Sequence, residues 1–191
     1  MTPRTILQNE QIRRLKKEHI KSVALELFAE HGYHATSISN IAKNASISKG
    51  LLYNYFESKE RLLKSIISDG FDKIIVSFDP NKDGILTQEE LIFFINSIID
   101  MMQKDKSFWR LYMSLLIQPA VHDSKIVEEF RDKASFVFKM LTEYYVRKGS
   151  KDPESDITVL HMVMDGIFFN YLYDDEFPIE KIKKIIIERF V

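Results

Sequence analysis

The fold is decided by residues 36–56, which read TSISNIAKNASISKGLLYNYF. Two short helical patterns lie in this stretch, one ending near Asn44 and one running from Ser48 to about Tyr55. Serine at position 48 is a residue type that accepts hydrogen bonds from the free N–H groups at a helix start. Only Ala45-Ser46-Ile47 separates the two patterns. This spacing predicts a helix-turn-helix motif, in which the first helix braces the second.

The apolar positions of the motif predict how it is held together. We expect the two helices to pack through Ile41, Ala42, Ile47 and Leu52. The first turn of the second helix is then presented outward, as in proteins that read the DNA major groove. Charge also favours a polyanionic partner, because residues 1–64 have eleven Lys/Arg against six Asp/Glu, whereas residues 65–191 have sixteen against twenty-two.

The rest of the chain also predicts helices. Only 6 Gly and 5 Pro are present, which is few for a β-rich protein. Gly32 has the position of a C-cap glycine, and Thr87 with Glu90 forms a capping box. Residues 1–11 are expected to be a flexible arm. Further helices are expected over residues 12–31, 58–78, 87–103, 107–118, 124–148, 153–173 and 178–190. The expected fold class is all-α, with about nine helices, made of a three-helix N-terminal head and a C-terminal helical bundle.

The composition narrows the functional classes. The chain has no cysteine, which excludes disulfides and thiolate metal sites and fits a cytoplasmic location. No signal peptide and no run of about 18 apolar residues is visible, so we expect no membrane association. No Gly-rich phosphate loop, nucleophile elbow or His pair at i, i+4 is present, so we do not expect an enzyme.

Two stretches of the N-terminal part resemble the TetR family of transcriptional regulators. Residues 27–42 read LFAEHGYHATSISNIA and look like the family's first two helices. Residues 47–62 read ISKGLLYNYFESKERL and look like its recognition helix and the start of its fourth helix. The resemblance implies a DNA-binding domain over residues 1–60, with the recognition motif at 37–56, and an effector-binding and dimerisation domain over residues 61–191.

The same resemblance implies the DNA contacts. Base-edge contacts are expected in the recognition helix, at Lys49, Gly50, Leu51 and Asn54, and its N-cap Ser48 is also expected at the DNA-binding surface. Phosphate contacts are expected at Thr36, Ser37, Tyr53, Tyr55 and Lys59. Lysine can donate to guanine, asparagine can pair with adenine, and leucine can touch the thymine methyl group. Core packing is the alternative for the two tyrosines. The family often has a basic residue where this chain has Ser39, so one common contact is missing.

Basic residues of the arm and first helix can follow the DNA backbone or enter the minor groove. They are Arg4, Arg13, Arg14, Lys16 and Lys17. A solvated charged face is the alternative.

The resemblance also implies a homodimer through the last two helices, about 154–173 and 178–190, which binds a near-palindromic double-stranded DNA operator. The apolar faces compatible with this pairing carry Val159, Val163, Ile167, Tyr171, Ile182, Ile185 and Ile186. The family expectation is repression that a small molecule releases.

Soft and aromatic residues of the later helices predict a pocket for an apolar effector. The candidates are Trp109, Met113, Phe136, Met140, Tyr144, His161, Met164 and Phe168. His161 is the expected polar contact within this pocket. Ordinary core packing is the alternative for each of these residues.

A separate motif occupies residues 79–90, which read DPNKDGILTQEE. This matches the EF-hand pattern, with calcium ligands expected from Asp79, Asn81, Asp83, the Ile85 carbonyl, Thr87 and Glu90. The alternatives are a plain helix connector and, for Glu90, the capping box. No required cofactor is expected, and calcium at this loop is a hypothesis.

The function predicted is sequence-specific DNA binding by a transcriptional regulator. The alternative is a calcium-responsive helical interaction protein, for which steep salt dependence of DNA binding is not expected.

Overall fold

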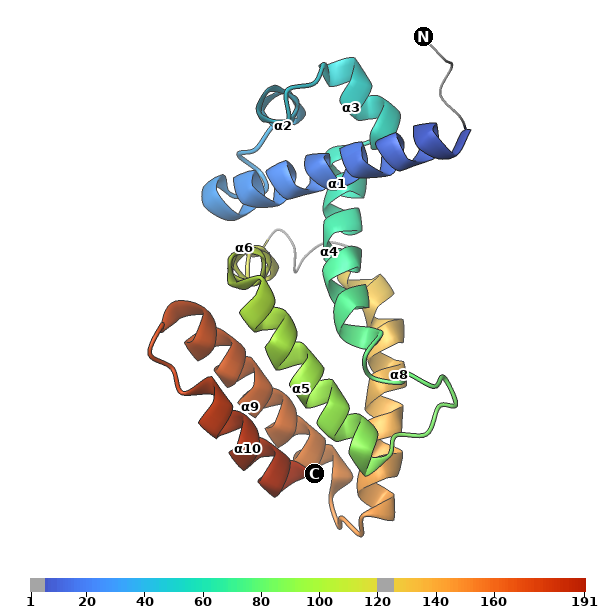
Figure 1. The fold of residues 1–191 in the computed structure, drawn as a ribbon, viewed down its shortest axis with the longest axis vertical. Helices are drawn as coiled ribbons and strands as arrows, with labels where there is room; N and C mark the ends of the chain where they lie inside the picture. Colours follow the sequence, from blue (N-terminus) through green and yellow to red (C-terminus); the bar gives the residue numbers. More distant parts are fainter. Residues whose placement is uncertain (1–5, 120–125) are drawn as a thin grey trace. The chain divides into compact units, whose positions relative to one another are not determined.

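A computed structural model describes residues 6–119 and 126–191, with the side chains of residues 7–119 and 134–191. Within these ranges the chain forms α-helices and no strand (Figure 1). The helices are α1 (Ile6–His31), α2 (Ile38–Asn44), α3 (Lys49–Tyr55), α4 (Lys59–Ile75), α5 (Gln88–Lys104), α6 (Lys106–Leu116), α8 (Ile126–Arg147), α9 (Pro153–Tyr173) and α10 (Ile179–Phe190). The prediction of an all-α fold is confirmed.

The chain divides into two compact units. The first unit comprises residues up to Asp69 and the described part of Leu111–Ile126, and the second comprises Gly70–Arg110 and Val127–Val191. The first unit therefore contains α1, α2, α3, the first part of α4 and the end of α6. Two helices, α4 and α6, are divided between the units, and α8 has its first residue, Ile126, in the first unit.

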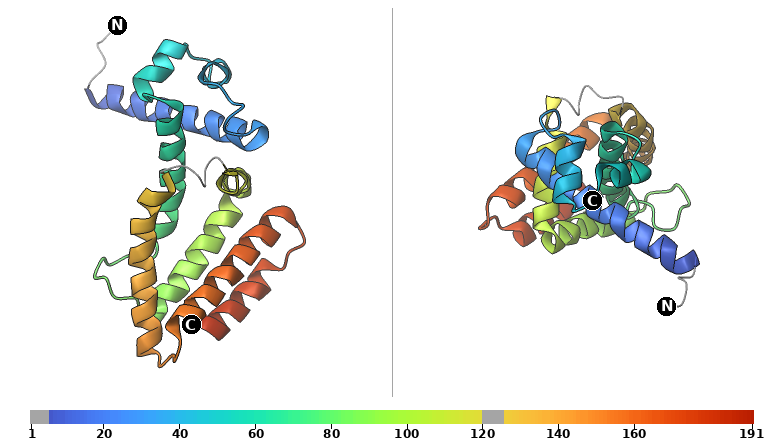
Figure 2. Two further views of the ribbon diagram at one scale, coloured as in Figure 1. Left: turned by 180° about the vertical axis from the view of Figure 1, so that it is seen from behind. Right: turned by 90° about the horizontal axis from the view of Figure 1, so that it is seen from above.

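The core of the first unit draws on all of its helices. Residues at helical spacing on α1 are buried together with side chains of α2, α3, α4 and α6, namely Ile20, Ala24, Phe28, Ile41, Leu52, Leu62 and Leu115. Figure 2 shows α1 crossing α4. At this crossing, Lys21 of α1 forms an ion pair with Asp69 of α4. The two carboxylates next to Lys21, those of Asp69 and Glu18, outweigh its burial and raise the pKa of Lys21 above its ordinary value.

Local sequence signals set several helix ends. Ser48 Oγ accepts from the Leu51 N–H at 3.1 Å, which confirms Ser48 as the N-cap of α3. Thr87 and Glu90 form the predicted capping box of α5. Gly32 follows α1 with φ +86°, a left-handed conformation that glycine adopts without strain. Such caps contribute about 1 kcal/mol each, because they satisfy backbone groups that a helix end leaves free.

The start of the first helix differs from the prediction. Residues 1–11 were expected to be a flexible arm, but α1 begins at Ile6, so residues 6–11 are helical. No proline or glycine interrupts the chain between Ile6 and His31, so nothing in the sequence stops the helix from extending toward its N-terminus. Arg4 of the predicted arm lies outside the described residues.

The second unit is a helical bundle in which α10 packs on α5 and α9 (Figure 1). Within this bundle, polar side chains donate hydrogen bonds to backbone carbonyls at the ends of neighbouring helices. Arg110 of α6 donates from Nε and Nη2 to the Leu172 carbonyl at the end of α9, at 3.0 and 2.6 Å. The Tyr144 and Tyr145 hydroxyls of α8 donate to the Val191 and Phe190 carbonyls, each at 3.0 Å. Burial raises the pKa of Tyr145 to about 12. None of the described helices is long and apolar enough to span a bilayer.

One hydrogen bond of the first unit gives a test of the packing between α6 and α4. The buried Tyr112 hydroxyl donates to the Ile67 carbonyl at 3.0 Å. We expect Tyr112→Phe to lower the free energy of unfolding by about 1 kcal/mol, because a buried hydrogen bond is lost. Urea unfolding followed by circular dichroism measures this. Tyr53→Phe, which alters a side chain that is 45% exposed, is the matched control. Equal stability of the two variants would contradict the assignment.

Candidate functional site

The start of α3 is presented to solvent. Lys49, Gly50, Tyr53 and Asn54 are exposed, whereas Leu52 is fully buried on the opposite side of the helix. Ser48 is also exposed, and its hydroxyl caps the helix. The helix therefore shows one polar face of short and hydrogen-bonding side chains. This is the surface that a helix needs in order to enter a DNA groove.

The turn between α2 and α3 holds this face in place. Ile41 and Ala42 are buried under α2, as the pattern predicts. Ser46 has φ +54°, and the Ile47 N–H donates to the Ala42 carbonyl at 3.0 Å. The three-residue connection is therefore a hydrogen-bonded helix end rather than an open loop.

Two aromatic or apolar residues of α3 have mixed environments. Leu51 and Tyr55 are half-buried, so each can contribute to packing and still expose an edge. The Arg13 guanidinium of α1 lies 6.0 Å from the centre of the Tyr55 ring, within range of a cation–π contact. For Tyr53, an exposed fraction of 45% argues against simple core packing.

Thr36 has a structural role instead of the predicted phosphate contact. The residue is 2% exposed, and its hydroxyl lies within hydrogen-bond distance of the Gly32 carbonyl at 2.9 Å and the Leu27 carbonyl at 3.1 Å. A hydroxyl hydrogen engaged inside the protein cannot also donate to a phosphate. Ser37, by contrast, is exposed and caps α2 by accepting from the Asn40 N–H at 3.1 Å.

Lys59 is also engaged inside the protein. Its ammonium nitrogen is 2.8 Å from the Tyr33 carbonyl, 2.9 Å from the Thr36 carbonyl and 3.4 Å from that of His34. It also lies 4.4 Å from the centre of the Tyr33 ring. Partial burial lowers the pKa of Lys59. Since an ammonium group has three donors, the carbonyls use the capacity that a phosphate contact needs, and the expected phosphate role is corrected to a structural one.

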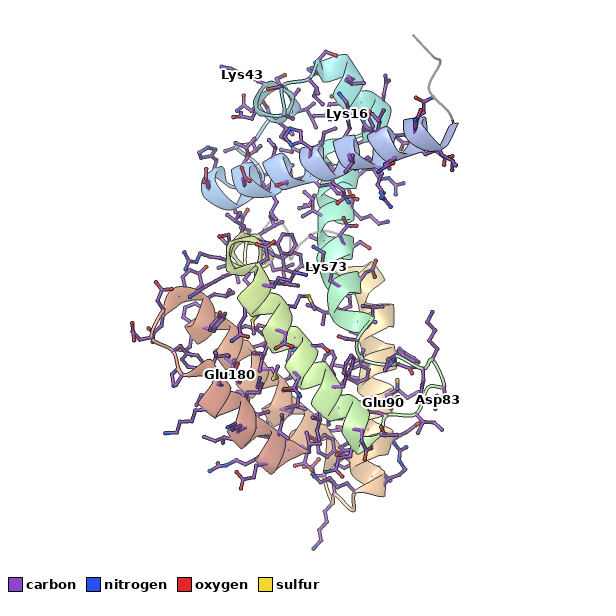
Figure 3. The ribbon with its side chains drawn as sticks, in the orientation of Figure 1. Lys16, Lys43, Lys73, Asp83, Glu90 and Glu180 are labelled. Carbon is purple, nitrogen blue, oxygen red and sulfur yellow. The ribbon has the colours of Figure 1, made fainter. Side chains whose placement is uncertain are left out.

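Other cations surround the motif. Arg13, Arg14 and Lys16 of α1 are exposed, and Lys43 lies exposed in the last turn of α2. Figure 3 labels Lys16 and Lys43 on these helices. Lys17 is half-buried, with its ammonium 5.5 Å from the centre of the Phe56 ring. Lys43 was not among the residues predicted to contact DNA. Its position, one residue after the buried Ala42 of α2, is the sequence feature that indicates an exposed cation there.

In the loop of residues 79–90, the polar side chains form hydrogen bonds mainly with backbone groups of the same loop. The Gly84 N–H donates to Asp79 Oδ2 at 3.2 Å, and Gly84 has φ +74°. Asn81 Oδ1 accepts from the Asp83 N–H at 3.0 Å, and Asp83 Oδ1 accepts from the Ile85 N–H at 2.8 Å. The predicted ligand oxygens of these three side chains are therefore partly engaged by the loop's own backbone.

The carboxylate expected to complete a calcium site is also engaged. Glu90 Oε2 accepts from the Thr87 N–H at 2.9 Å and lies 3.1 Å from the Thr87 hydroxyl oxygen (Figure 3 labels Glu90 and Asp83). Across the described ranges, no group of three or more His, Cys, Asp or Glu is arranged to hold a metal. Asp79 Oδ1 differs from the other ligand oxygens predicted in this loop, because it is buried and has no hydrogen-bond partner.

The residues predicted to line an effector pocket differ in their burial. The buried ones are Trp109, Met140, Tyr144 and Met164, while Met113 and Phe168 are half-buried. The other two point outward. Phe136 is 45% exposed, and the His161 side chain is 64% exposed with Nδ1 3.6 Å from the Asp165 carboxylate. His161 as the polar contact inside a pocket is therefore contradicted, because its position on α9 places it on the surface.

The apolar residues of α9 and α10 divide between the interior and the surface. Ile167 and Ile186, which were expected on a dimer face, are buried within this chain. Val159, which was also expected on that face, is exposed, and so are three apolar residues of α9 that were not expected there, Met162, Phe169 and Tyr173. Phe138 of α8 is exposed too, and its ring lies 6.5 Å from that of His161. An apolar surface therefore runs along α9 and includes part of α8.

Comparisons with known proteins agree with this description. Residues 20–66 match the family model described as "Bacterial regulatory proteins, tetR family". The chain is 24% identical over 164 residues to the HTH-type negative transcriptional regulator of the biofilm operon, IcaR, from Staphylococcus epidermidis, covering 85% of this chain and 88% of that protein. It is 50% identical over 58 residues to the HTH-type regulator YuxN of Bacillus subtilis, covering 30% of this chain and 20% of that protein.

The fold is likewise similar to that of solved regulators. The transcriptional regulator FadR of Bacillus subtilis, solved in complex with stearoyl-CoA, has a TM-score of 0.70 at 20% identity, covering 91% of this chain and 97% of that one. A transcriptional regulator of Pseudomonas aeruginosa has a TM-score of 0.71 at 16% identity, covering 89% and 86%. The matched relatives are regulators and not enzymes. Residues 20–66 therefore form a DNA-binding domain of the TetR type, and the chain as a whole is similar to transcriptional regulators.

Proposed function

We propose that the protein is a cytoplasmic, homodimeric repressor that binds a near-palindromic DNA operator and is released from it by a small apolar molecule. Residues 1–60 form the DNA-binding domain in this proposal, and residues 61–191 bind the effector and the second subunit. The observation that carries it is the outward face of α3, where Lys49, Tyr53 and Asn54 are exposed above a buried Leu52.

The side chains of α3 suggest how an operator is read. Lys49 and Asn54 supply donors and an acceptor for base edges, and Leu51 supplies an apolar contact for a thymine methyl group. Gly50 has no heavy atom within 4 Å of the position that a Cβ would take, so it leaves the start of the helix open to close approach. Ser37, Tyr53 and Tyr55 have hydroxyls suited to phosphates, which fix the register of a protein on the duplex.

The apolar surface of α9 supports the dimer. Met162 and Phe169 are 66% and 64% exposed, and exposed apolar patches of this kind mark protein interfaces. A two-fold dimer places two recognition helices on successive turns of one face of the duplex. For the effector, buried soft and aromatic residues of the second unit, such as Trp109, Met140 and Met164, favour an apolar molecule.

DNA binding can be tested with duplexes selected by the purified protein from a random-sequence pool. We expect Lys49→Ala and Tyr53→Ala each to weaken binding of the selected duplex at least tenfold, because one contact of about 1–3 kcal/mol is lost. Fluorescence anisotropy at fixed salt measures the affinity. Lys151→Ala removes an exposed cation outside the helix-turn-helix motif and should bind as the wild type does. Wild-type affinity in both α3 variants would exclude α3 as the reading helix.

Dimer formation can be tested on α9. We expect Phe169→Glu to convert a dimer to monomers, because a buried charge at the centre of an apolar interface costs several kcal/mol. Sedimentation or light scattering measures the mass. The matched control is Phe93→Glu on α5, which changes another exposed phenylalanine, 51% exposed against 64% for Phe169. If Phe169→Glu stays dimeric, the subunits pair elsewhere.

The loop of residues 79–90 supports a second proposal, that calcium binds there. One observation favours it, the buried Asp79 Oδ1 that has no hydrogen-bond partner. In the EF-hand pattern this is the first ligand position, and Glu90 is the twelfth. Binding requires Glu90 to leave the capping box.

Calorimetric titration with calcium chloride tests this second proposal. We expect the wild type to release or absorb heat of binding, and Glu90→Gln to bind at least tenfold more weakly, because a bidentate carboxylate is lost. Glutamine still serves in a capping box, so the variant keeps the start of α5. A wild-type titration without binding heat would rule out a calcium site in this loop.

A further inference from the structure

Gln118 lies two residues after the end of α6. Both the oxygen and the nitrogen of its side-chain amide form hydrogen bonds with the backbone at the end of α1. Its Oε1 accepts from the Tyr33 N–H at 3.0 Å, and its Nε2 donates to the Phe28 carbonyl at 2.9 Å. Its partners lie 85 and 90 residues away in sequence, yet all three residues belong to the first unit. A single side chain thus connects the end of α6 to the backbone on both sides of Gly32.

The way in which α1 ends explains why this contact matters. Helices commonly end with two backbone hydrogen bonds around a left-handed residue, the second of which satisfies the N–H that follows it. The end of α8 does so, because the Gly149 N–H donates to the Val146 carbonyl and the Ser150 N–H to that of Tyr145. The end of α2 has the same pair of bonds around Ser46.

The end of α1 has a different arrangement. The Gly32 N–H donates to the Phe28 carbonyl at 3.0 Å, which is the single bond of the simpler left-handed cap. That cap leaves the next N–H, that of Tyr33, without a carbonyl of the helix. Gln118 supplies the acceptor instead. The direction in which the chain leaves α1 therefore depends on a side chain carried by another part of the unit.

The turn that Gln118 holds leads directly to the DNA-reading motif. Residues 33–36 connect α1 to Ser37, the N-cap of α2, and α2 braces α3. Thr36 ties the far end of the turn to the Gly32 carbonyl, and Lys59 holds three of its carbonyls. Gln118 is the member of this network that comes from the region after α6.

We propose that Gln118 is a positioning residue for operator binding, through which the end of α6 holds the α1–α2 turn and thereby the helix-turn-helix motif. The inference rests on the proposed function, since it concerns how that site is held.

The experiment compares Gln118→Met, which keeps the length of the side chain and removes both hydrogen bonds, with Tyr112→Phe. The control removes another hydrogen bond that the C-terminal half of α6 makes within the first unit, but this bond is made to α4 and not to the turn. Three quantities are measured on the full chain: the urea midpoint, the affinity for the selected duplex over a range of salt, and the exchange rate of the Tyr33 amide by NMR.

For Gln118→Met we expect amide exchange at Tyr33 to be at least tenfold faster and operator affinity to fall about tenfold. The slope of affinity against salt should not change, because no phosphate contact is removed. For Tyr112→Phe, at a comparable loss of stability, we expect affinity within twofold of the wild type. Gln118→Glu keeps an acceptor for Tyr33 and should retain slow exchange there.

Two results would overturn the inference while leaving the proposed function intact. One is wild-type operator affinity in Gln118→Met with fast exchange at Tyr33, which would show that the turn is not coupled to DNA binding. The other is an equal loss of affinity in Gln118→Met and Tyr112→Phe, which would reduce Gln118 to a contributor to stability. If the wild type selects no duplex at all, the proposed function itself fails.

Discussion

The DNA-reading surface depends on the burial of one apolar residue on the inner side of a seven-residue helix. Leu52 is fully buried, and α3 (Lys49–Tyr55) is too short to be stable on its own. Packing of Leu52 in the core that also buries Ile41 and Phe28 fixes the rotation of α3 about its axis. That rotation decides that Lys49, Tyr53 and Asn54 face outward. A different rotation would give the same helix without a reading face.

Features set by neighbouring residues could be predicted from the sequence. The N-cap at Ser48, the capping box of Thr87 and Glu90, and the left-handed Gly32 each depend on a few consecutive positions. Hydrogen bonding within one turn of helix decides such features, so the sequence pattern contains the information. The all-α class follows for the same reason, because helical periodicity is a local property.

Features set by residues distant in sequence could not be predicted in the same way. Thr36 and Lys59 were assigned to phosphates because their positions match a family pattern, but carbonyls of the α1–α2 turn take up their donors. The residue types alone do not distinguish these partners. Gln118 was missed because nothing near it in the chain indicates that its amide meets α1. His161 was misplaced because the helical pattern of α9 did not reveal which of its sides is covered.

We propose that the motif over residues 36–56 is the surface that binds DNA. Hydrogen exchange of the 191-residue chain, measured by mass spectrometry with and without its selected duplex, is the decisive test. We expect exchange to slow in peptides covering the starts of α2 and α3, where backbone N–H groups and side chains contact the duplex. Unchanged exchange in these peptides, with slowing confined to the loop of residues 79–90 or to the second unit, would contradict it.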